Sequence, residues 1–314
     1  MRAATVRDGT VVVAEHPDPV PGAGEALVRV RAAGVNNADL LQAKGFYPAP
    51  PGSPPDIPGL ELAGEVVALG PGAARFSVGD RVMAVVGGGG QAELAVVHER
   101  AAMPVPDGLP WDQAGGLPEA YTTAHDALFT QCGLSMGERL CVHGAAGGVG
   151  SAAVHLAAAA GARVVATVRN PSLHEAVAGL GAEVVVAPDD FPGHGPYDVV
   201  LELIGAPNTG ANVDALAMGG RIVVIGVGGG ANAELNLLAL MAKRGRISAS
   251  TLRARPLEQK ADAARRMEAN VLPLFEDGRA SVPVAATYPL DDVAAAYEHF
   301  AVGGKFGKIV LTLD

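Results

Sequence analysis

The chain has 314 residues, of which 49% are hydrophobic, and it carries a formal net charge of −10 and two cysteines. This length predicts two domains with sizeable cores, the negative charge argues against nucleic acid as a partner, and two cysteines are too few for a disulfide framework or a cysteine-rich zinc lobe. The N-terminus lacks the apolar region of a signal peptide and no apolar run reaches the roughly 18–20 residues of a membrane helix, so we expect a cytoplasmic protein with no membrane partner.

The first ~120 residues are typical of a small antiparallel β-barrel, because short β-rich stretches alternate with Gly and Pro turns. We expect strands at residues 10–14, 26–32, 60–69, 79–86 and 92–97, and a short helix at 37–44. A Pro-rich loop follows that helix over residues 45–58, and the glycines at 87–90 predict a flexible tip.

From residue 120 the pattern changes to alternating helices and strands. Strands are expected at residues 140–143, 163–168, 183–187, 197–203 and 221–225, and helices at 120–129, 151–160, 172–180 and 213–218. This βαβ rhythm predicts a doubly wound parallel sheet and therefore an α/β fold class. Two more helices, at 257–274 and 290–300, precede a last strand at 308–312, which we expect to rejoin the first domain.

Residues 139–150 predict a strand, a glycine turn and the start of a helix. Gly147 and Gly150 occupy the last two glycine positions of a dinucleotide-binding motif, and Ala145 stands at the first. Backbone N–H groups in such a turn and at the helix N-terminus suit a pyrophosphate. The candidate cofactor-binding residues in this turn are Ala146, Gly147, Gly148, Val149 and Gly150.

The end of the next strand discriminates between the two nicotinamide cofactors. An acidic residue there would bind the ribose 2′-hydroxyl of NAD, but this strand ends in Arg169 and Asn170. Arg169 can pair with a 2′-phosphate through its planar guanidinium, and Asn170 can donate a hydrogen bond. The pattern favours NADP(H); the alternative is a solvated surface arginine.

Two further segments are candidate cofactor contacts. Gly226 and Val227 follow the strand at 221–225, at the edge of the sheet where ligands bind, so their backbone could hold the nicotinamide carboxamide. They could equally be the exit of a plain buried strand. Thr123 lies on the helix that enters the α/β segment and could reach the cofactor or simply cap its helix.

Motifs over nearly the whole chain make it similar to the zinc-free, zeta-crystallin-like quinone oxidoreductases of the medium-chain dehydrogenase/reductase superfamily. They lie at residues 34–40, 45–48, 58–67, 78–82, 142–150 and 307–311. The resemblance implies a GroES-like catalytic domain at 1–119 and 255–314, a Rossmann NADP-binding domain at 120–254, an active-site cleft between them and a homodimer.

Zinc-dependent relatives place a Cys where this chain has Asn36, and a Gly-His-Glu motif where it has Gly59, Leu60 and Glu61. An amide and a leucine cannot replace a thiolate and an imidazole as zinc ligands. We therefore expect no catalytic metal, and expect Glu61 to hydrogen-bond nearby backbone or an arginine.

Without a Lewis acid, alcohol dehydrogenation is disfavoured, and a quinone or conjugated enone is the better hydride acceptor. The resemblance implies catalytic roles for Tyr47 and Asn36, since family members carry Tyr and Asn at these positions. Tyr47 could stack on or hydrogen-bond to the acceptor, or merely pack on the prolines of its loop. Asn36 could instead bond its own backbone.

The leading hypothesis is a metal-free oxidoreductase that uses NADPH to reduce a quinone. An NADPH-dependent enoyl or enone reductase is the alternative enzyme, and an NADPH-binding structural protein with little turnover is the alternative of another class. Two other patterns are set aside. Ser135 lies in a GxSxG match that follows a helix and precedes a strand, unlike a nucleophile elbow. His143 lies on a buried strand and is expected to be a hydrogen-bonded core residue.

Overall fold

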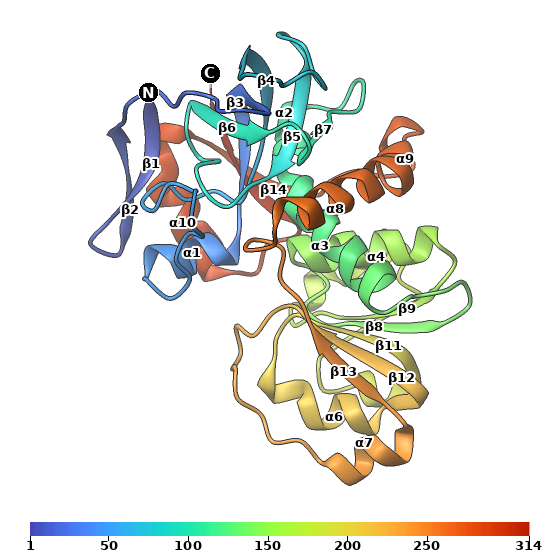
Figure 1. Ribbon diagram of the computed structural model, residues 1–314. Coiled ribbons are helices and arrows are strands. Elements are labelled where there is room, and N and C mark those ends of the chain that lie inside the picture. The colour runs from blue at the N-terminus through green and yellow to red at the C-terminus, as the bar shows by residue number, and fades with distance from the viewer. Residues whose placement is uncertain (314) are drawn as a thin grey trace. The chain divides into compact units, whose positions relative to one another are not determined.

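The computed structural model describes residues 1–313, which divide into two compact units (Figure 1). The β-rich unit contains Met1–Thr122 and the chain from Leu252 onward, and the α/β unit contains Thr123–Thr251. The chain therefore passes between the units at 122/123 and 251/252, where the sequence suggested 119/120 and 254/255. Among the described residues, no helix has the length and apolar character needed to cross a membrane.

A seven-stranded sheet organises the β-rich unit, and a separate hairpin of β1 (Arg2–Arg7) and β2 (Thr10–Glu15) flanks it. Its strand order is β14-β15-β3-β4-β5-β7, with β6 also paired to β3. The strands are β3 (Glu25–Val35), β4 (Glu61–Leu69), β5 (Arg81–Val85), β6 (Leu94–His98), β7 (Ala102–Pro104), β14 (Val284–Pro289) and β15 (Lys308–Thr312). Because β15 pairs antiparallel with β3, the prediction that the tail rejoins the first unit is confirmed.

The helices of the β-rich unit cover this sheet. They are α1 (Asn37–Ala43), α2 (Trp111–Gly116), α8 (Leu257–Asn270), α9 (Leu272–Glu276) and α10 (Val293–Val302, after the 3₁₀ turn η5, Leu290–Asp292), while α3 (Pro118–His125) spans the boundary between units. The single helix expected over 257–274 is interrupted at Val271. Pro273 has no N–H to continue the helical hydrogen bonds, and its ring opposes an uninterrupted helix.

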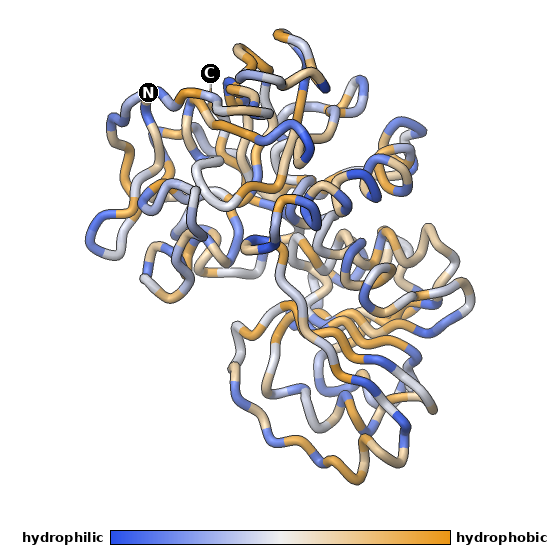
Figure 2. Tube along the Cα trace, viewed as in Figure 1, coloured by the Kyte–Doolittle hydropathy of each residue, from blue (hydrophilic) through white to orange (hydrophobic). Residues whose placement is uncertain are grey.

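The α/β unit contains a parallel six-stranded sheet of order β10-β9-β8-β11-β12-β13. The strands are β8 (Arg139–Val142), β9 (Arg163–Thr167), β10 (Val184–Val186), β11 (Tyr197–Glu202), β12 (Leu216–Val224) and β13 (Arg246–Ala249). Hydrophobic colour runs along these strands in Figure 2, as expected for strands buried on both faces. The order reverses at β8, between β9 and β11, so ligands are expected at the carboxyl ends of these strands.

Helices cover both faces of the parallel sheet: Figure 1 shows α4 on one side and α6 and α7 on the other. The helical elements are α4 (Gly148–Ala159), α5 (His174–Ala178), α6 (Thr209–Asp214), α7 (Leu237–Lys243), the π-helix η1 (Asp126–Gln131) and the 3₁₀ turns η2 (Pro171–Leu173), η3 (Phe191–His194) and η4 (Ala206–Asn208). The helix expected at 213–218 is wrong beyond Asp214, because β12 already begins at Leu216.

The expected flexible tip at residues 87–90 is also wrong. Gly87, Gly89 and Gly90 are buried, and the Gly89 N–H donates to the carbonyl of Ile57 at 2.9 Å. A Cβ on Gly90 would lie 2.7 Å from the carbonyl oxygen of Glu61. These glycines therefore let the segment pack tightly against residues 53–61, and they do not create a mobile loop.

Candidate functional site

A buried polar cluster surrounds Asn36 in the β-rich unit. The Lys308 ammonium lies 2.6 Å from Oε1 of Glu61 and donates to Oδ1 of Asn36 at 2.6 Å. The Asn36 amide group closes the triangle by donating from Nδ2 to Oε1 of Glu61 at 2.9 Å. We call these three residues the Lys308–Glu61–Asn36 cluster.

The cluster fixes the orientation of the Asn36 side chain. An ammonium only donates hydrogen bonds, so the atom facing Lys308 must be the amide oxygen. A carboxylate only accepts, so the atom facing Glu61 must be the amide nitrogen. One Nδ2 hydrogen is then used and one remains, on a side chain that is only partly buried. Asn36 therefore presents one fixed N–H donor.

The side chain of Glu61 is 0% exposed, so its hydrogen-bond and ion-pair partners must compensate for the loss of water. Its second oxygen accepts from the backbone N–H of Glu119 at 2.8 Å, which completes the compensation that a buried ion pair needs. Any Cβ on Gly34 would collide with Oε1 of Glu61, which explains the glycine at the start of the 34–40 motif. The backbone bond expected for Glu61 is present, but its cation is Lys308 and not an arginine.

Asp39 fixes the start of α1 and with it the backbone of Asn36. Its carboxyl accepts from the N–H of Asn36 at 2.8 Å and from the N–H of Gly59 at 3.0 Å. Gln91 also faces it at 3.4 Å, and the Tyr297 hydroxyl donates to Gln91 at 2.7 Å. Complete burial raises the pKa of Asp39 to about 7, although the two backbone donors oppose that shift.

Tyr47, the other catalytic candidate, lies on the loop over 45–58 and is partly exposed. Its carbonyl accepts from the guanidinium of Arg253 at 2.9 Å, and the guanidinium carbon lies 5.0 Å from the centre of its ring. Arg253 also donates to Gln42 of α1. Tyr47 and Asn36 are thus connected through α1.

The predicted dinucleotide turn joins β8 to α4. Gly147 precedes α4 without any side chain capping the helix, so the first N–H groups of the helix keep their donor capacity. A Cβ on Gly150 would lie 2.7 Å from Cα of Ala145, so only glycine allows this close approach of helix and strand. The residues that line this turn, Ala146, Gly147, Gly148, Val149 and Gly150, fit a pyrophosphate.

Arg169 and Asn170 follow β9 and are exposed. Within residues 1–313 Arg169 forms no hydrogen bond or ion pair, so its full donor capacity faces solvent. The Oδ1 atom of Asn170 accepts from the N–H of Ser172 at 3.1 Å and from its hydroxyl at 2.9 Å, which turns the amide nitrogen outward as a donor. Both residues fit a phosphate near the end of β9.

The other cofactor candidates fit in part. Gly226 packs against Leu203 at the end of β11, and its N–H donates to the Glu202 carbonyl at 3.2 Å. Val227 is 48% exposed. Thr123 is buried, and the hydroxyl of the neighbouring Thr122 is buried without a hydrogen-bond partner within residues 1–313.

A buried network that sequence reasoning did not anticipate lies under the dinucleotide turn. His143 contacts Oδ1 of Asn212 at 2.7 Å, and Asn212 donates from Nδ2 to Glu202 at 2.7 Å. Because the carboxylate of Glu202 sets the Asn212 amide, Nε2 of His143 must carry the proton. Nδ1 then accepts from the Thr167 hydroxyl at 3.2 Å, and burial lowers the pKa of His143, which keeps it neutral.

Glu202 connects this network to the loop after β11. Its other oxygen accepts from the N–H groups of Ile204 at 2.6 Å and Gly205 at 2.8 Å. The network therefore couples the ends of β8, β9 and β11, which are the strands at the point where the sheet order reverses. The expectation that His143 is a hydrogen-bonded core residue agrees with this geometry.

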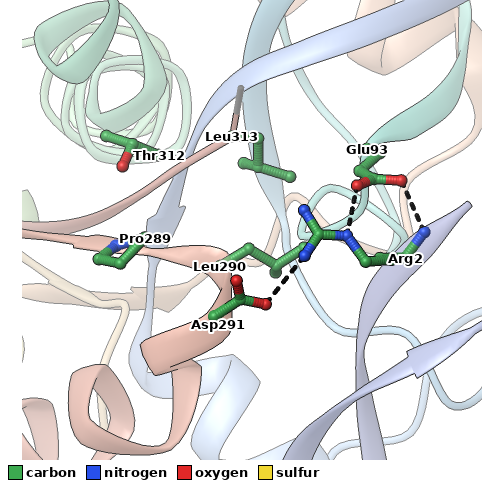
Figure 3. Close-up of a pocket in the computed structure, with 7 residues that line it drawn as sticks. All are labelled: Arg2, Glu93, Pro289, Leu290, Asp291, Thr312 and Leu313. Carbon is green, nitrogen blue, oxygen red and sulfur yellow. Dashed lines mark hydrogen bonds and ion pairs between the residues drawn. The ribbon is translucent and has the colours of Figure 1, made fainter.

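Figure 3 shows a small pocket elsewhere in the β-rich unit, with a volume of about 40 Å³. The Arg2 guanidinium on its wall already binds Glu93 at 2.7 Å and Asp291 at 3.0 Å. The pocket has space for little more than a water molecule and offers no uncompensated charge. Within residues 1–313, no group of three or more His, Cys, Asp or Glu side chains is arranged to hold a metal.

Family models match two parts of the chain: the alcohol dehydrogenase GroES-like domain over residues 22–107 and the zinc-binding dehydrogenase domain over residues 180–311. A solved NAD-dependent alcohol dehydrogenase superposes with a TM-score of 0.88 at 27% identity, over 100% of both chains. These matches confirm the expected α/β fold, with a GroES-like unit and a Rossmann-type parallel sheet.

Two curated relatives are informative about activity. The chain is 31% identical over 306 residues to the quinone oxidoreductase of Homo sapiens, which covers 94% of this chain and 91% of that protein. It is 34% identical over 303 residues to polyketide synthase GfsB of Streptomyces halstedii, but this covers 92% of the chain and only 5% of that synthase.

Proposed function

Because this chain belongs to the quinone oxidoreductase family of the medium-chain dehydrogenase/reductase superfamily, we propose that it reduces a quinone with NADPH and without a catalytic metal. The fold implies an oxidoreductase with a nicotinamide cofactor and a small-molecule substrate.

The α/β unit supports NADPH as the cofactor. The glycine turn before α4 would hold the pyrophosphate, and the uncompensated Arg169 would pair with the 2′-phosphate. No acidic residue stands at the end of β9 to select the 2′-hydroxyl of NAD. A reduced nicotinamide, when bound, supplies a hydride.

The fixed N–H of Asn36 is the observation that carries the proposed reaction. A quinone or enone gains negative charge on a carbonyl oxygen when it accepts a hydride, and a preorganised donor stabilises that charge. Lys308 and Glu61 hold the Asn36 amide in one orientation, so it loses no freedom when it donates. Tyr47 would stack on the acceptor or hydrogen-bond to it.

The same cluster supports metal-free chemistry. Asn36 and Leu60 stand where zinc-dependent relatives have ligands, and neither side chain is a zinc ligand of the usual kind. The Lys308 ammonium lies against the carboxylate of Glu61, a side chain that could otherwise help to hold a cation. Its positive charge would repel a divalent ion at this position.

An enone or enoyl-thioester reductase is the second candidate, and the similarity to part of a polyketide synthase favours it. Its acceptor would also develop charge on a carbonyl oxygen, so Asn36 would act in the same way. Binding of NADPH without turnover is the third candidate. Unlike the two enzymes, such a protein needs no hydrogen-bond donor to stabilise a hydride-accepting substrate.

The test is an assay of NADPH oxidation by the metal-analysed protein with benzoquinones, naphthoquinones and 2-alkenals. We expect turnover with quinones at a zinc content far below one ion per chain, and Asn36→Ala to lower kcat about 10²-fold. Asn37→Ala, which changes the exposed neighbouring amide, serves as the matched control and keeps full activity.

Each other outcome assigns a different function. Turnover with 2-alkenals but not with quinones would select the enone reductase. Thermal stabilisation by NADPH without oxidation by any acceptor would select the binding protein. Activity that requires a stoichiometric metal, or an Asn36→Ala variant as active as the native chain, would contradict the role given to the cluster.

A further inference from the structure

Arg253 is a buried cation without a carboxylate partner. Its side chain belongs to a residue that is 3% exposed, and within residues 1–313 it forms no ion pair. An isolated buried charge is unfavourable unless its hydrogen bonds compensate for the lost water. The hydrogen bonds of the guanidinium must therefore compensate for the water that it has lost.

The guanidinium donates to three segments that lie far apart in the sequence. Nε donates to the carbonyl of Gly87 at 2.8 Å, one terminal nitrogen to the carbonyl of Tyr47 at 2.9 Å, and the other to Oε1 of Gln42. These acceptors belong to the 87–90 segment, the 45–58 loop and α1. The planar fork of arginine suits three fixed acceptors in a way that a single ammonium does not.

Gln42 extends this hold to the other end of the loop. While its oxygen accepts from Arg253, its amide nitrogen donates to the carbonyl of Pro55 at 3.2 Å. Arg253 thus anchors the loop directly at Tyr47 and indirectly at Pro55. The guanidinium also lies 5.0 Å from the centre of the Tyr47 ring, so it holds both the backbone and the ring of that residue.

We propose that Arg253 is a positioning residue that fixes Tyr47 and the 45–58 loop for the acceptor, through its bonds to Tyr47, Gln42 and Gly87. Its role in turnover rests on the proposed function, whereas its hold on the loop does not. The rival explanation is a purely structural anchor for the chain where it re-enters the β-rich unit after Thr251. The two differ in which amides become mobile when the guanidinium is removed.

The experiment measures backbone hydrogen exchange together with turnover in Arg253→Met. We expect exchange in residues 46–58 and 87–90 to accelerate about 10- to 100-fold, the effect of losing charge-assisted hydrogen bonds. Residues 61–69 of β4 keep their native protection. We expect kcat for the quinone to fall while the Kd of NADPH stays within about twofold, because the cofactor residues belong to the other unit.

Two further variants keep the proposal testable if Arg253→Met fails to fold. Arg253→Lys keeps the charge but not the fork, and we expect it to restore part of the loop protection and part of kcat. Gln42→Met leaves Arg253 in place and should accelerate exchange at the amides of Asp56 and Ile57 more than at the amide of Tyr47. Arg31→Met is the matched control: it breaks the ion pair with Glu65 on the same sheet without touching the loop, so exchange at 46–58 stays native.

Native exchange at 46–58 in Arg253→Met, or acceleration spread evenly over the whole β-rich unit, would overturn the proposal. This result is independent of whether the proposed function is right. If none of the tested acceptors supports oxidation of NADPH by the native protein, the proposed function fails. The exchange data then still show whether Arg253 holds the loop. If the native protein turns over and the loop stays protected, only the role of Arg253 fails.

Discussion

In the proposed reaction, single side chains bear on the choice of cofactor and on the orientation of the hydrogen-bond donor for the acceptor. Arg169 is an exposed cation that forms no hydrogen bond or ion pair within residues 1–313, whereas Lys308 is a buried cation with every donor used. Uncompensated surface charge is available for a ligand, and compensated buried charge serves to orient its neighbours. Arg169 thus bears on cofactor choice, and Lys308 on the geometry of Asn36.

Replacing Arg169 with Ala should weaken NADPH binding and leave NADH binding nearly unchanged. A guanidinium–phosphate pair contributes charge-assisted hydrogen bonds, so we expect the Kd of NADPH to rise about 10- to 100-fold in a fluorescence titration. Arg163→Ala is the control, because it removes an exposed arginine from the opposite end of β9, where the side chain binds Glu183. Equal losses for NADPH and NADH in Arg169→Ala would refute the NADP assignment.

At the scale of elements, the ends of β8, β9 and β11 are held by one neutral histidine. His143 contacts groups on all sides: Asn212, Thr167, the Cys141 thiol at 3.8 Å and the Glu202 carboxylate at 3.9 Å. Burial lowers the pKa of His143, although Glu202 opposes that shift. A second proton would fill Nδ1, which now accepts from Thr167, and so would break the network.

The free energy of unfolding of the α/β unit should therefore fall as the pH falls below about 6.5. In the unfolded chain the pKa of His143 returns to its ordinary value of 6.5, so the unfolded state takes up the proton first and is favoured. Urea unfolding followed by circular dichroism at pH 7.5, 6.5 and 5.5 measures this. The free energy of unfolding should change less with pH in His143→Gln, because glutamine can still donate to Asn212 but does not titrate.

The comparison with His143→Gln is needed because titration of Asp39 changes the stability of the protein with pH in the opposite direction. Its folded pKa of about 7 exceeds the ordinary 3.8, so the β-rich unit loses stability as the pH rises through that interval. Trp111, the one tryptophan of the sequence, lies in the β-rich unit and reports on its unfolding by fluorescence. Identical pH dependence of the native protein and the variant by circular dichroism would exclude His143 as the cause.

At the scale of the whole molecule, the parallel sheet ends in an open edge. All residues of β13 are exposed, and apolar side chains precede it on α7, where Leu238 is 75% and Met241 71% exposed. An unpaired strand edge beside an apolar patch is a template for pairing with another chain. We propose that a second copy of this chain pairs along β13 and forms the homodimer expected from the sequence.

Analytical ultracentrifugation should accordingly give a mass twice the 31.6 kDa of one chain. Ile247→Lys, in the middle of β13, should shift the protein to the monomer, because a charge on an edge strand opposes pairing. Met136→Lys introduces the same charge at another exposed apolar residue, 82% exposed, and should leave the dimer intact. A native protein that sediments as one chain would refute the dimer.

Local patterns in the sequence predicted much of the fold. The alternation of β3, the glycine turn before α4 and the βαβ rhythm were readable because they depend on neighbouring residues and on backbone geometry. Strand β13 was missed since its exposed residues lack the apolar alternation of a half-buried strand. The start of β12 was misassigned as helix because pairing with β11, and not local propensity, makes it a strand.

For the site, the sequence by itself determined which residue types were available: an amide and a leucine in place of zinc ligands, a glycine turn, and a basic end to β9. Only the tertiary structure decided their partners. Lys308 meets Glu61 across 247 residues of chain, and Arg253 meets Tyr47 across 206. Such contacts exist because β15 pairs with β3 and because the chain returns to the β-rich unit after Thr251, and a side chain's chemistry depends on the neighbours that this topology supplies.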